Sequence, residues 1–134
     1  MRILLIEDDD LQARVLGELF AKHHSDIELE RVADGDEALS RLPASGSDTD
    51  APQLVLLDLG LERIDGLDFL VELRSMPRYR SLPVVVLSGS ADLEKVRGAY
   101  ERGANSYLKK PASPIELQSL VGLIVSYWGR TNVS

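Results

Sequence analysis

Short aliphatic runs alternate with segments of helical periodicity along this chain of 134 residues. The runs at residues 3–6, 54–57 and 84–87 are apolar at every position, which is typical of strands buried on both faces of a parallel sheet. Residues 27–32 mostly alternate apolar and charged positions, which favours a strand at the edge of the sheet. A weaker apolar pair at 107–108 completes a set of five predicted strands.

Apolar residues recur at helical spacing between the predicted strands. The stripes that we expect to face the sheet are Leu11, Val15 and Leu19, then Ala38, Leu39 and Leu42, then Leu67, Leu70 and Val71, then Leu93, Val96 and Tyr100, and last Leu117, Leu120, Val121, Ile124 and Trp128. Gly103 is placed to end the fourth helix, and residues 113–116 form a capping box with proline at the first helical position of the fifth. A strand followed by a helix, five times over, predicts an α/β fold whose helices cover both faces of a parallel sheet.

The composition limits both the fold and the function. The length suits one domain, which we place at residues 1–128, followed by a short frayed tail at 129–134. The absence of cysteine excludes a disulfide scaffold and a thiolate metal site. A net charge of -7 argues against broad contact with nucleic acid. There is no apolar run long enough to cross a membrane, and Glu7 comes too early for a signal peptide, so we expect a cytoplasmic protein.

Side chains that could do chemistry directly follow the predicted buried strands. The acids at 7–10 follow the first strand, Asp58 the third, Ser88 the fourth and Lys110 the fifth. The carboxyl ends of parallel strands meet at one edge of a sheet, so these groups should converge there. Two carboxylates ~4 Å apart repel by roughly 4 kcal/mol at an effective dielectric near 20, and we expect Mg²⁺ or Mn²⁺ to offset that repulsion. Carboxylates, a hydroxyl and an ammonium group together suit phosphoryl transfer to an aspartate.

Four motifs built on these residues resemble those of the response-regulator receiver domain. The motifs are Ile6-Glu7-Asp8-Asp9, Leu56-Leu57-Asp58-Leu59 with Asp65-Gly66, Leu87-Ser88-Gly89, and Tyr107-Leu108-Lys109-Lys110-Pro111. They stand in the family's order, and the resemblance extends from Arg2 to about Trp128. It implies a flavodoxin-like (βα)5 fold, a doubly wound parallel sheet with strand order 2-1-3-4-5.

The resemblance also implies roles in phosphorylation for individual residues. Asp58 is similar to the family's phosphoacceptor, while Ser88 and Lys110 stand where the family has the residues that contact the phosphoryl group. The backbone N–H of Gly89 would donate to that group as well. Ser88 and Tyr107 resemble the switch pair, in which the aromatic ring moves inward when the hydroxyl is drawn toward the phosphate.

The implied metal site uses the acids at the ends of the first and third strands. Asp8 resembles the direct ligand, Glu7 acts beside it through water, and Asp58 contributes its carboxylate. The carbonyl of Gly60 would be a further ligand, and the Gly60 N–H a further donor to the phosphoryl group. Gly60 and Ser90 stand at the positions that tune the lifetime of the acyl phosphate in the family.

The partners expected on this basis are proteins. A histidine kinase would supply the phosphoryl group, and the Trp128 ending together with the loop at 43–53 resembles small regulators that serve phytochrome-type kinases. The signal would leave through a downstream protein or a homodimer that uses the fourth and fifth helices, residues 91–103 and 114–128. We expect no contact with nucleic acid or membrane, and no enzymatic turnover beyond the domain's own phosphorylation and dephosphorylation.

Three alternatives remain open at this point. A degenerate receiver would bind partners without phosphorylation. An aspartyl-phosphate phosphohydrolase would need a general acid where Gly60 stands, and a flavin carrier would need a phosphate cradle in place of the acids at 7–10. Simpler structural interpretations also apply: Asp9 and Asp10 can be solvated acids at a helix start, and Tyr107 can be a packing residue.

Overall fold

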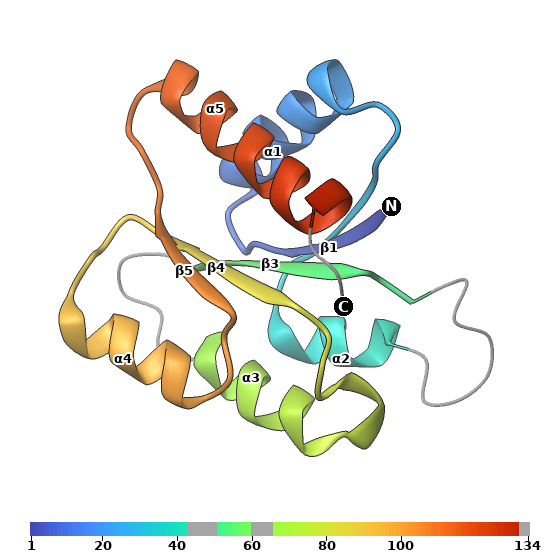
Figure 1. The fold of residues 1–134 in the computed structure, drawn as a ribbon, viewed down its shortest axis with the longest axis vertical. Helices are drawn as coiled ribbons and strands as arrows, with labels where there is room; N and C mark the ends of the chain where they lie inside the picture. Colours follow the sequence, from blue (N-terminus) through green and yellow to red (C-terminus); the bar gives the residue numbers. More distant parts are fainter. Residues whose placement is uncertain (43–50, 60–65, 132–134) are drawn as a thin grey trace.

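The computed structural model describes residues 1–42, 51–59 and 66–131. Strands and helices alternate along the chain as predicted (Figure 1). The elements are β1 (Arg2–Ile6), α1 (Asp10–His23), β2 (Glu28–Val32), α2 (Gly35–Arg41), β3 (Leu54–Leu59), α3 (Gly66–Ser75), the 3-10 turn η2 (Pro77–Tyr79), β4 (Val84–Ser88), α4 (Leu93–Glu101), β5 (Ser106–Lys109), α5 (Pro114–Ile124) and the π-helical turns η3 (Val125–Thr131).

The strands form one parallel sheet with the order β2-β1-β3-β4-β5, which is the order that we predicted. The predicted edge strand β2 lies at one edge and β5 at the other. Ile6 at the end of β1 pairs with Leu57 of β3, and Ser88 at the end of β4 pairs with Lys109 of β5. The carboxyl ends of the strands therefore meet along one edge of the sheet.

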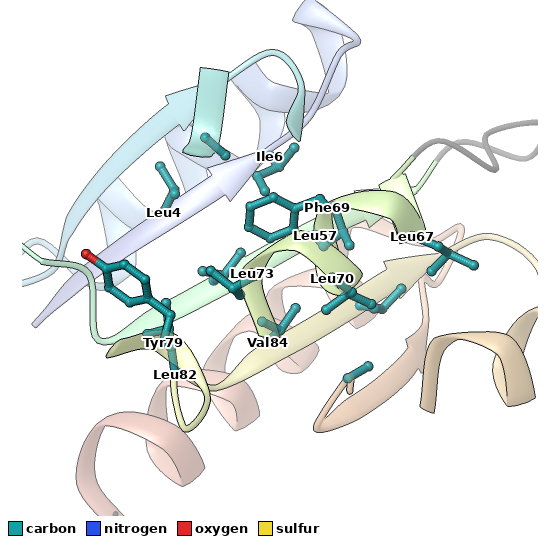
Figure 2. Close-up of a cluster of buried hydrophobic side chains, with 14 of the residues drawn as sticks. Leu4, Ile6, Leu57, Leu67, Phe69, Leu70, Leu73, Tyr79, Leu82 and Val84 are labelled. Atoms are coloured by element: carbon teal, nitrogen blue, oxygen red, sulfur yellow. The ribbon is translucent and has the colours of Figure 1, made fainter. Parts of the chain in front are cut away.

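Helices cover both faces of the sheet, with α1 and α5 on one side and α2, α3 and α4 on the other (Figure 1). Successive residues of a strand point to opposite faces. In β3, Leu54 and Leu56 join the core beneath α1 and α5, while Val55 and Leu57 join the core on the other face (Figure 2). Both faces are buried, and this explains why the central strands are apolar at every position.

The apolar stripe predicted for α1 is wrong in part, because only Leu19 of its three residues packs against the core. The helix buries Ala13, Leu16 and Phe20. Leu11, by contrast, is 66% exposed, and Val15 is 40% exposed. Phe20 offers far more apolar area than any other side chain of this helix, and small Ala13 lets the helix approach the sheet. Packing these residues turns the predicted stripe partly toward solvent.

The stripe predicted for α4 is also wrong, and that for α3 is wrong in part. Within α4 only Ala99 is fully buried, while Leu93 is 74% exposed and Tyr100 lies at the surface. In α3 the predicted Val71 is exposed, and Phe69 is buried instead. The stripe of α5 is confirmed, because its buried residues are Leu117, Val121 and Ile124.

The predicted helix ends are confirmed, but the predicted tail is not. Gly103 follows α4 with φ +105°, a left-handed conformation that suits glycine. The Ser113 side chain accepts a hydrogen bond from a backbone N–H in the first turn of α5. Helical backbone continues through Gly129 to Thr131, where a frayed tail was expected. Half-buried Trp128 packs against the core beneath α1 and α5 and holds this last turn in place.

Candidate functional site

Two acids lie side by side where β1 and β3 end. Since Ile6 pairs with Leu57, the residues that follow, Glu7 and Asp58, occupy adjacent positions at the edge of the sheet. Both are buried, at 3% and 4% exposed. Burial, followed by the charge of Asp58, raises the pKa of Glu7 to about 8. Among the described residues, Glu7 Oε2 is the one buried side-chain oxygen or nitrogen without a hydrogen-bond partner.

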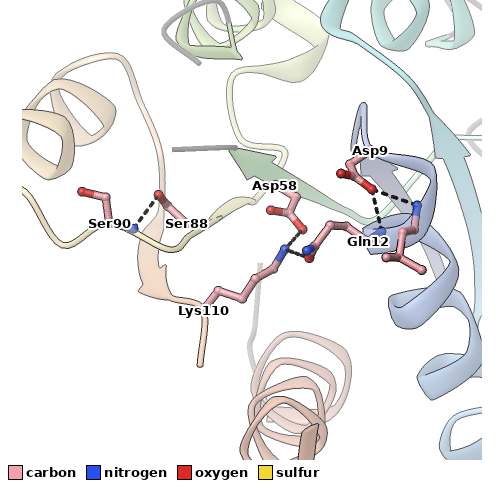
Figure 3. A network of polar contacts seen from close by, with 7 residues as sticks. Asp9, Gln12, Asp58, Ser88, Ser90 and Lys110 are labelled. Carbon is pink, nitrogen blue, oxygen red and sulfur yellow. Dashed lines mark hydrogen bonds and ion pairs between the residues drawn. The ribbon is translucent and has the colours of Figure 1, made fainter. Parts of the chain in front are cut away.

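Lys110 holds the Asp58 carboxylate directly (Figure 3). Its Nζ lies 2.5 Å from Asp58 Oδ2, and its own backbone N–H donates to the carbonyl of Ser88 at 2.7 Å. This backbone bond fixes Lys110 beside the end of β4, so its side chain reaches across to β3. The pKa of Asp58 is raised, because burial outweighs the opposing effect of the Lys110 ammonium. Asp58 and Lys110 therefore converge at one edge of the sheet, as predicted, and their direct contact is an addition that the structure makes.

Gln12 completes this contact, and sequence reasoning missed it. Lys110 Nζ donates a second hydrogen bond to Gln12 Oε1 at 2.8 Å (Figure 3). Asp9 caps α1 by accepting from the N–H groups of Leu11 and Gln12, which confirms it as an acid at a helix start. This cap sets the first turn of α1 at the carboxyl end of the sheet. The sequence signal for this role was a polar residue, Gln12, three positions after the helix cap Asp9.

Ser88 and Tyr107, the predicted switch pair, both contact Ser90. Ser88 is 1% exposed, and its Oγ accepts from the Ser90 N–H at 3.2 Å. The Tyr107 hydroxyl donates to the Ser90 carbonyl at 2.8 Å, and the Tyr107 N–H donates to the Tyr100 hydroxyl at 3.0 Å. Ser88 and Asp58 lie at the carboxyl ends of the neighbouring strands β4 and β3, so both are at the same end of the sheet.

An arginine that the sequence did not single out contacts the acidic segment after β1. Arg31, on β2, pairs with Asp10 at 2.9 Å and donates from Nε to the Glu7 carbonyl at 2.8 Å. Asp8 is exposed, and a hydrogen bond between its side chain and that of Glu7 helps to raise the pKa of Glu7. The predicted ligands Glu7, Asp8 and Asp58 thus interact electrostatically.

The donor set fits a hydrated divalent cation. In the described parts of the chain, no three carboxylate, imidazole or thiol side chains lie close enough to hold a metal by themselves. Mg²⁺ needs only one or two carboxylates and keeps several waters. Burial raises the pKa of both Glu7 and Asp58, and one Glu7 oxygen has no hydrogen-bond partner, so a bound cation would stabilise both carboxylates in their charged form. Gly60, a further predicted ligand and donor, lies outside the described residues, and Gly89 is exposed directly after β4.

This fold and this acidic site define a receiver, and comparison with known proteins agrees. Residues 3–122 match the response regulator receiver domain. The chain therefore belongs to the response regulator receiver family of two-component systems. In the described residues, no helix is long and apolar enough to span a membrane.

Several relatives are similar over nearly the whole chain. The probable methanogenesis regulatory protein FilR2 of Methanothrix harundinacea is 37% identical, over 94% of this chain and 82% of its own. Response regulator Rcp1 of Synechocystis is 35% identical, over 96% of this chain and 89% of its own.

Solved structures of related regulators share the fold. A Mn(2+)-bound form of Rcp1 is 34% identical and has a TM-score of 0.80, over 98% of this chain and 96% of the other. The phosphorylated cyanobacterial phytochrome response regulator RcpA is 34% identical with a TM-score of 0.85, over the same shares.

Proposed function

We propose that this receiver is a response regulator activated by phosphorylation of Asp58, with a histidine kinase as the donor and Mg²⁺ as the cofactor. The observation that carries this proposal is the contact of the buried Asp58 carboxylate with Lys110, beside a second buried acid, Glu7. A carboxylate that accepts a phosphoryl group needs positive charge on one side and room for a cation on the other.

The transfer step follows from these residues. A carboxylate oxygen of Asp58 attacks phosphorus, the bond from phosphorus to the donor atom breaks, and its electron pair leaves with the donor. The Lys110 ammonium moves from the Asp58 carboxylate to a phosphoryl oxygen, and the N–H of Gly89 donates to another. A divalent cation held by Glu7, Asp8 and Asp58 would supply the charge that offsets the phosphoryl and carboxylate oxygens.

The relatives support the proposed cofactor and donor. Rcp1 is known in a Mn(2+)-bound form, and RcpA is a phosphorylated phytochrome response regulator. Similarity to both over nearly the full chain favours a divalent cation at this site. It also favours a histidine kinase of the phytochrome type as the phosphoryl donor, and a cytoplasmic location.

The new phosphoryl group would act on the surface through Ser90. If Ser88 rotates toward the phosphate, the Ser90 N–H loses its acceptor, while the Ser90 carbonyl still accepts from Tyr107. Ser90 Oγ in turn accepts from the N–H of Asp92, the N-cap of α4. The change therefore reaches the start of α4, and we propose that a downstream protein or a second copy recognises the surface of α4 and α5.

The principal test is intact mass after incubation with acetyl phosphate and Mg²⁺. The wild type and Asp26→Asn, a control at an exposed acid in the turn before β2, should each gain one phosphoryl group. Asp58→Asn should gain none, and removal of Mg²⁺ with EDTA should abolish the gain in every variant. An equal gain in Asp58→Asn would contradict the proposal, and so would a wild type that gains no mass.

A second assay addresses the phosphohydrolase alternative. The domain should catalyse only its own phosphorylation and dephosphorylation, because Gly60 provides no general acid for a leaving group. A phosphate ester with an alcohol leaving group, which needs a general acid, should therefore show no sustained release of phosphate. Sustained release that disappears in Asp58→Asn would instead indicate the phosphohydrolase.

A further inference from the structure

The Lys110 ammonium is shared between two acceptors at the edge of the sheet. One is Asp58 Oδ2 at 2.5 Å, and the other is Gln12 Oε1 at 2.8 Å (Figure 3). Asp58 belongs to β3, Gln12 to the first turn of α1, and Lys110 follows β5, so the contact joins three separate elements. Phosphorylation would change the charged acceptor, the Asp58 carboxylate. It would leave the neutral acceptor, the Gln12 amide, unchanged.

We propose that Gln12 is a positioning residue, which holds the Lys110 ammonium in place while it transfers from the Asp58 carboxylate to the phosphoryl group. This inference rests on the proposed phosphorylation of Asp58. An ammonium group has three donors, so Lys110 can release Asp58 Oδ2 and still donate to Gln12. The retained bond limits where Nζ can move, and therefore keeps it within reach of the incoming phosphoryl oxygen.

The Gln12 side chain is not needed to build the surrounding fold. The first turn of α1 is capped by the Asp9 carboxylate, which accepts from the Gln12 backbone and not from its side chain. The backbone of Lys110 is fixed separately, by its bond to the Ser88 carbonyl. Gln12 is itself exposed. Its amide therefore acts on the position of the ammonium group rather than on the stability of the domain.

Phosphorylation rates provide the test. We expect Gln12→Leu to slow phosphorylation by acetyl phosphate at saturating Mg²⁺ by roughly three- to tenfold, the range for the net contribution of one ordinary hydrogen bond. Gln12→Asn keeps the amide but is one methylene shorter, so it should be slowed as well. Lys22→Leu, at an exposed polar position in the last turn of α1, is the control and should react at the wild-type rate. All variants should keep the wild-type unfolding midpoint and the same dependence on Mg²⁺ concentration.

A double-variant comparison tests whether Gln12 acts through Lys110. In a Lys110→Met background, adding Gln12→Leu should change the residual rate by less than about twofold, because the partner of the amide is gone. An equal slowing in both backgrounds would overturn the proposal, as would a wild-type rate in Gln12→Leu. If the wild type gains a phosphoryl group and Asp58→Asn does not, either of these two results would refute the proposed role of Gln12 and leave the proposed phosphorylation of Asp58 intact. A wild type that cannot be phosphorylated removes both proposals.

Discussion

The two ends of the sheet differ in how well their buried polar side chains are hydrogen-bonded. At the carboxyl end, Glu7 and Asp58 are buried acids with raised pKa values, and one Glu7 oxygen has no partner in the described residues. At the amino end, half-buried Arg74 is surrounded by acceptors. It donates to the Gly103 carbonyl at 3.1 and 2.8 Å and to Asn105 Oδ1 at 3.0 Å. It also donates to the carbonyls of Tyr79 at 2.8 Å and Leu82 at 2.7 Å.

The amino end of the sheet therefore contributes to stability, while the carboxyl end is suited to binding. The Arg74 contacts tie the end of α3 to the segments that lead into β4 and β5, and each nitrogen of the Arg74 guanidinium has an acceptor. The acidic end keeps excess negative charge, which costs stability and favours the binding of positive charge. Proteins commonly lose stability in this way at the sites that bind their ligands.

Removal of Arg74 should have the largest effect on stability. Arg74→Met leaves several carbonyl oxygens without a donor and should lower the free energy of unfolding by ~3 kcal/mol. Denaturant unfolding measures this, with Arg80→Met, at an exposed arginine, as the control. The rate of Asp58 phosphorylation should stay close to wild type in folded Arg74→Met. A large loss of that rate in the folded variant would show that the two ends are not independent.

The buried acids should give a pH dependence of the opposite sign to that of an ordinary ion-paired carboxylate. Between its usual pKa of 4.5 and about 8, Glu7 binds more protons in the folded state than in the unfolded state. Without Mg²⁺, its contribution to stability is therefore present at low pH and lost as the pH rises through this window.

Replacement of Glu7 by glutamine isolates that contribution. Glu7→Gln should be more stable than the wild type by on the order of 2 kcal/mol at pH 8.5, with the difference shrinking toward pH 5. Added Mg²⁺ should stabilise the wild type more at pH 8.5 than at pH 6, because a metal ligand must be deprotonated. Unfolding with and without Mg²⁺ measures both effects. Glu101→Gln, at an exposed acid, should show neither, and a wild type more stable than Glu7→Gln at pH 8.5 would contradict the expectation.

Gly103 offers a smaller test of the amino end. An alanine there would adopt a left-handed φ, and its Cβ would lie 2.8 Å from Arg74 Cγ, so Gly103→Ala should cost ~1–2 kcal/mol. Gly122→Ala in α5 meets nothing within 4 Å and should instead stabilise by ~0.5–1 kcal/mol. Thermal unfolding distinguishes the two. Equal shifts for both variants would mean that the close packing of Gly103 against Arg74 does not matter.

The sequence predicted the sheet and the acidic end well for a physical reason. Buried parallel strands must be apolar at every position, and the residue that follows such a strand necessarily lies at the edge of the sheet. The convergence of Asp58 and Lys110 at this edge follows from this geometry. Helix faces are harder to predict, because surface helices tolerate exposed apolar residues such as Leu11 and Leu93.

The contacts of long polar side chains could not be predicted from the hydrophobic pattern. Gln12, Arg31 and Arg74 act by reaching partners that are distant in sequence, and their partners depend on tertiary packing. A glutamine or arginine in a polar segment looks the same whether it contacts solvent or the site. The motif predicted Ser88 as a site residue but not the direction of its hydroxyl, which is set by the Ser90 N–H.

The single tryptophan of the chain gives the molecule an optical property that follows from its place in the fold. Trp128 lines a hollow of about 720 Å³ with Met1, Tyr79 and Pro83, at the amino end of the sheet. A strand of the length of β3 spans ~20 Å, and it separates this indole from Asp58. Intrinsic fluorescence should therefore report unfolding of the domain while staying nearly unchanged when Asp58 is modified, so that one sample can be followed by emission for folding and by mass for phosphorylation.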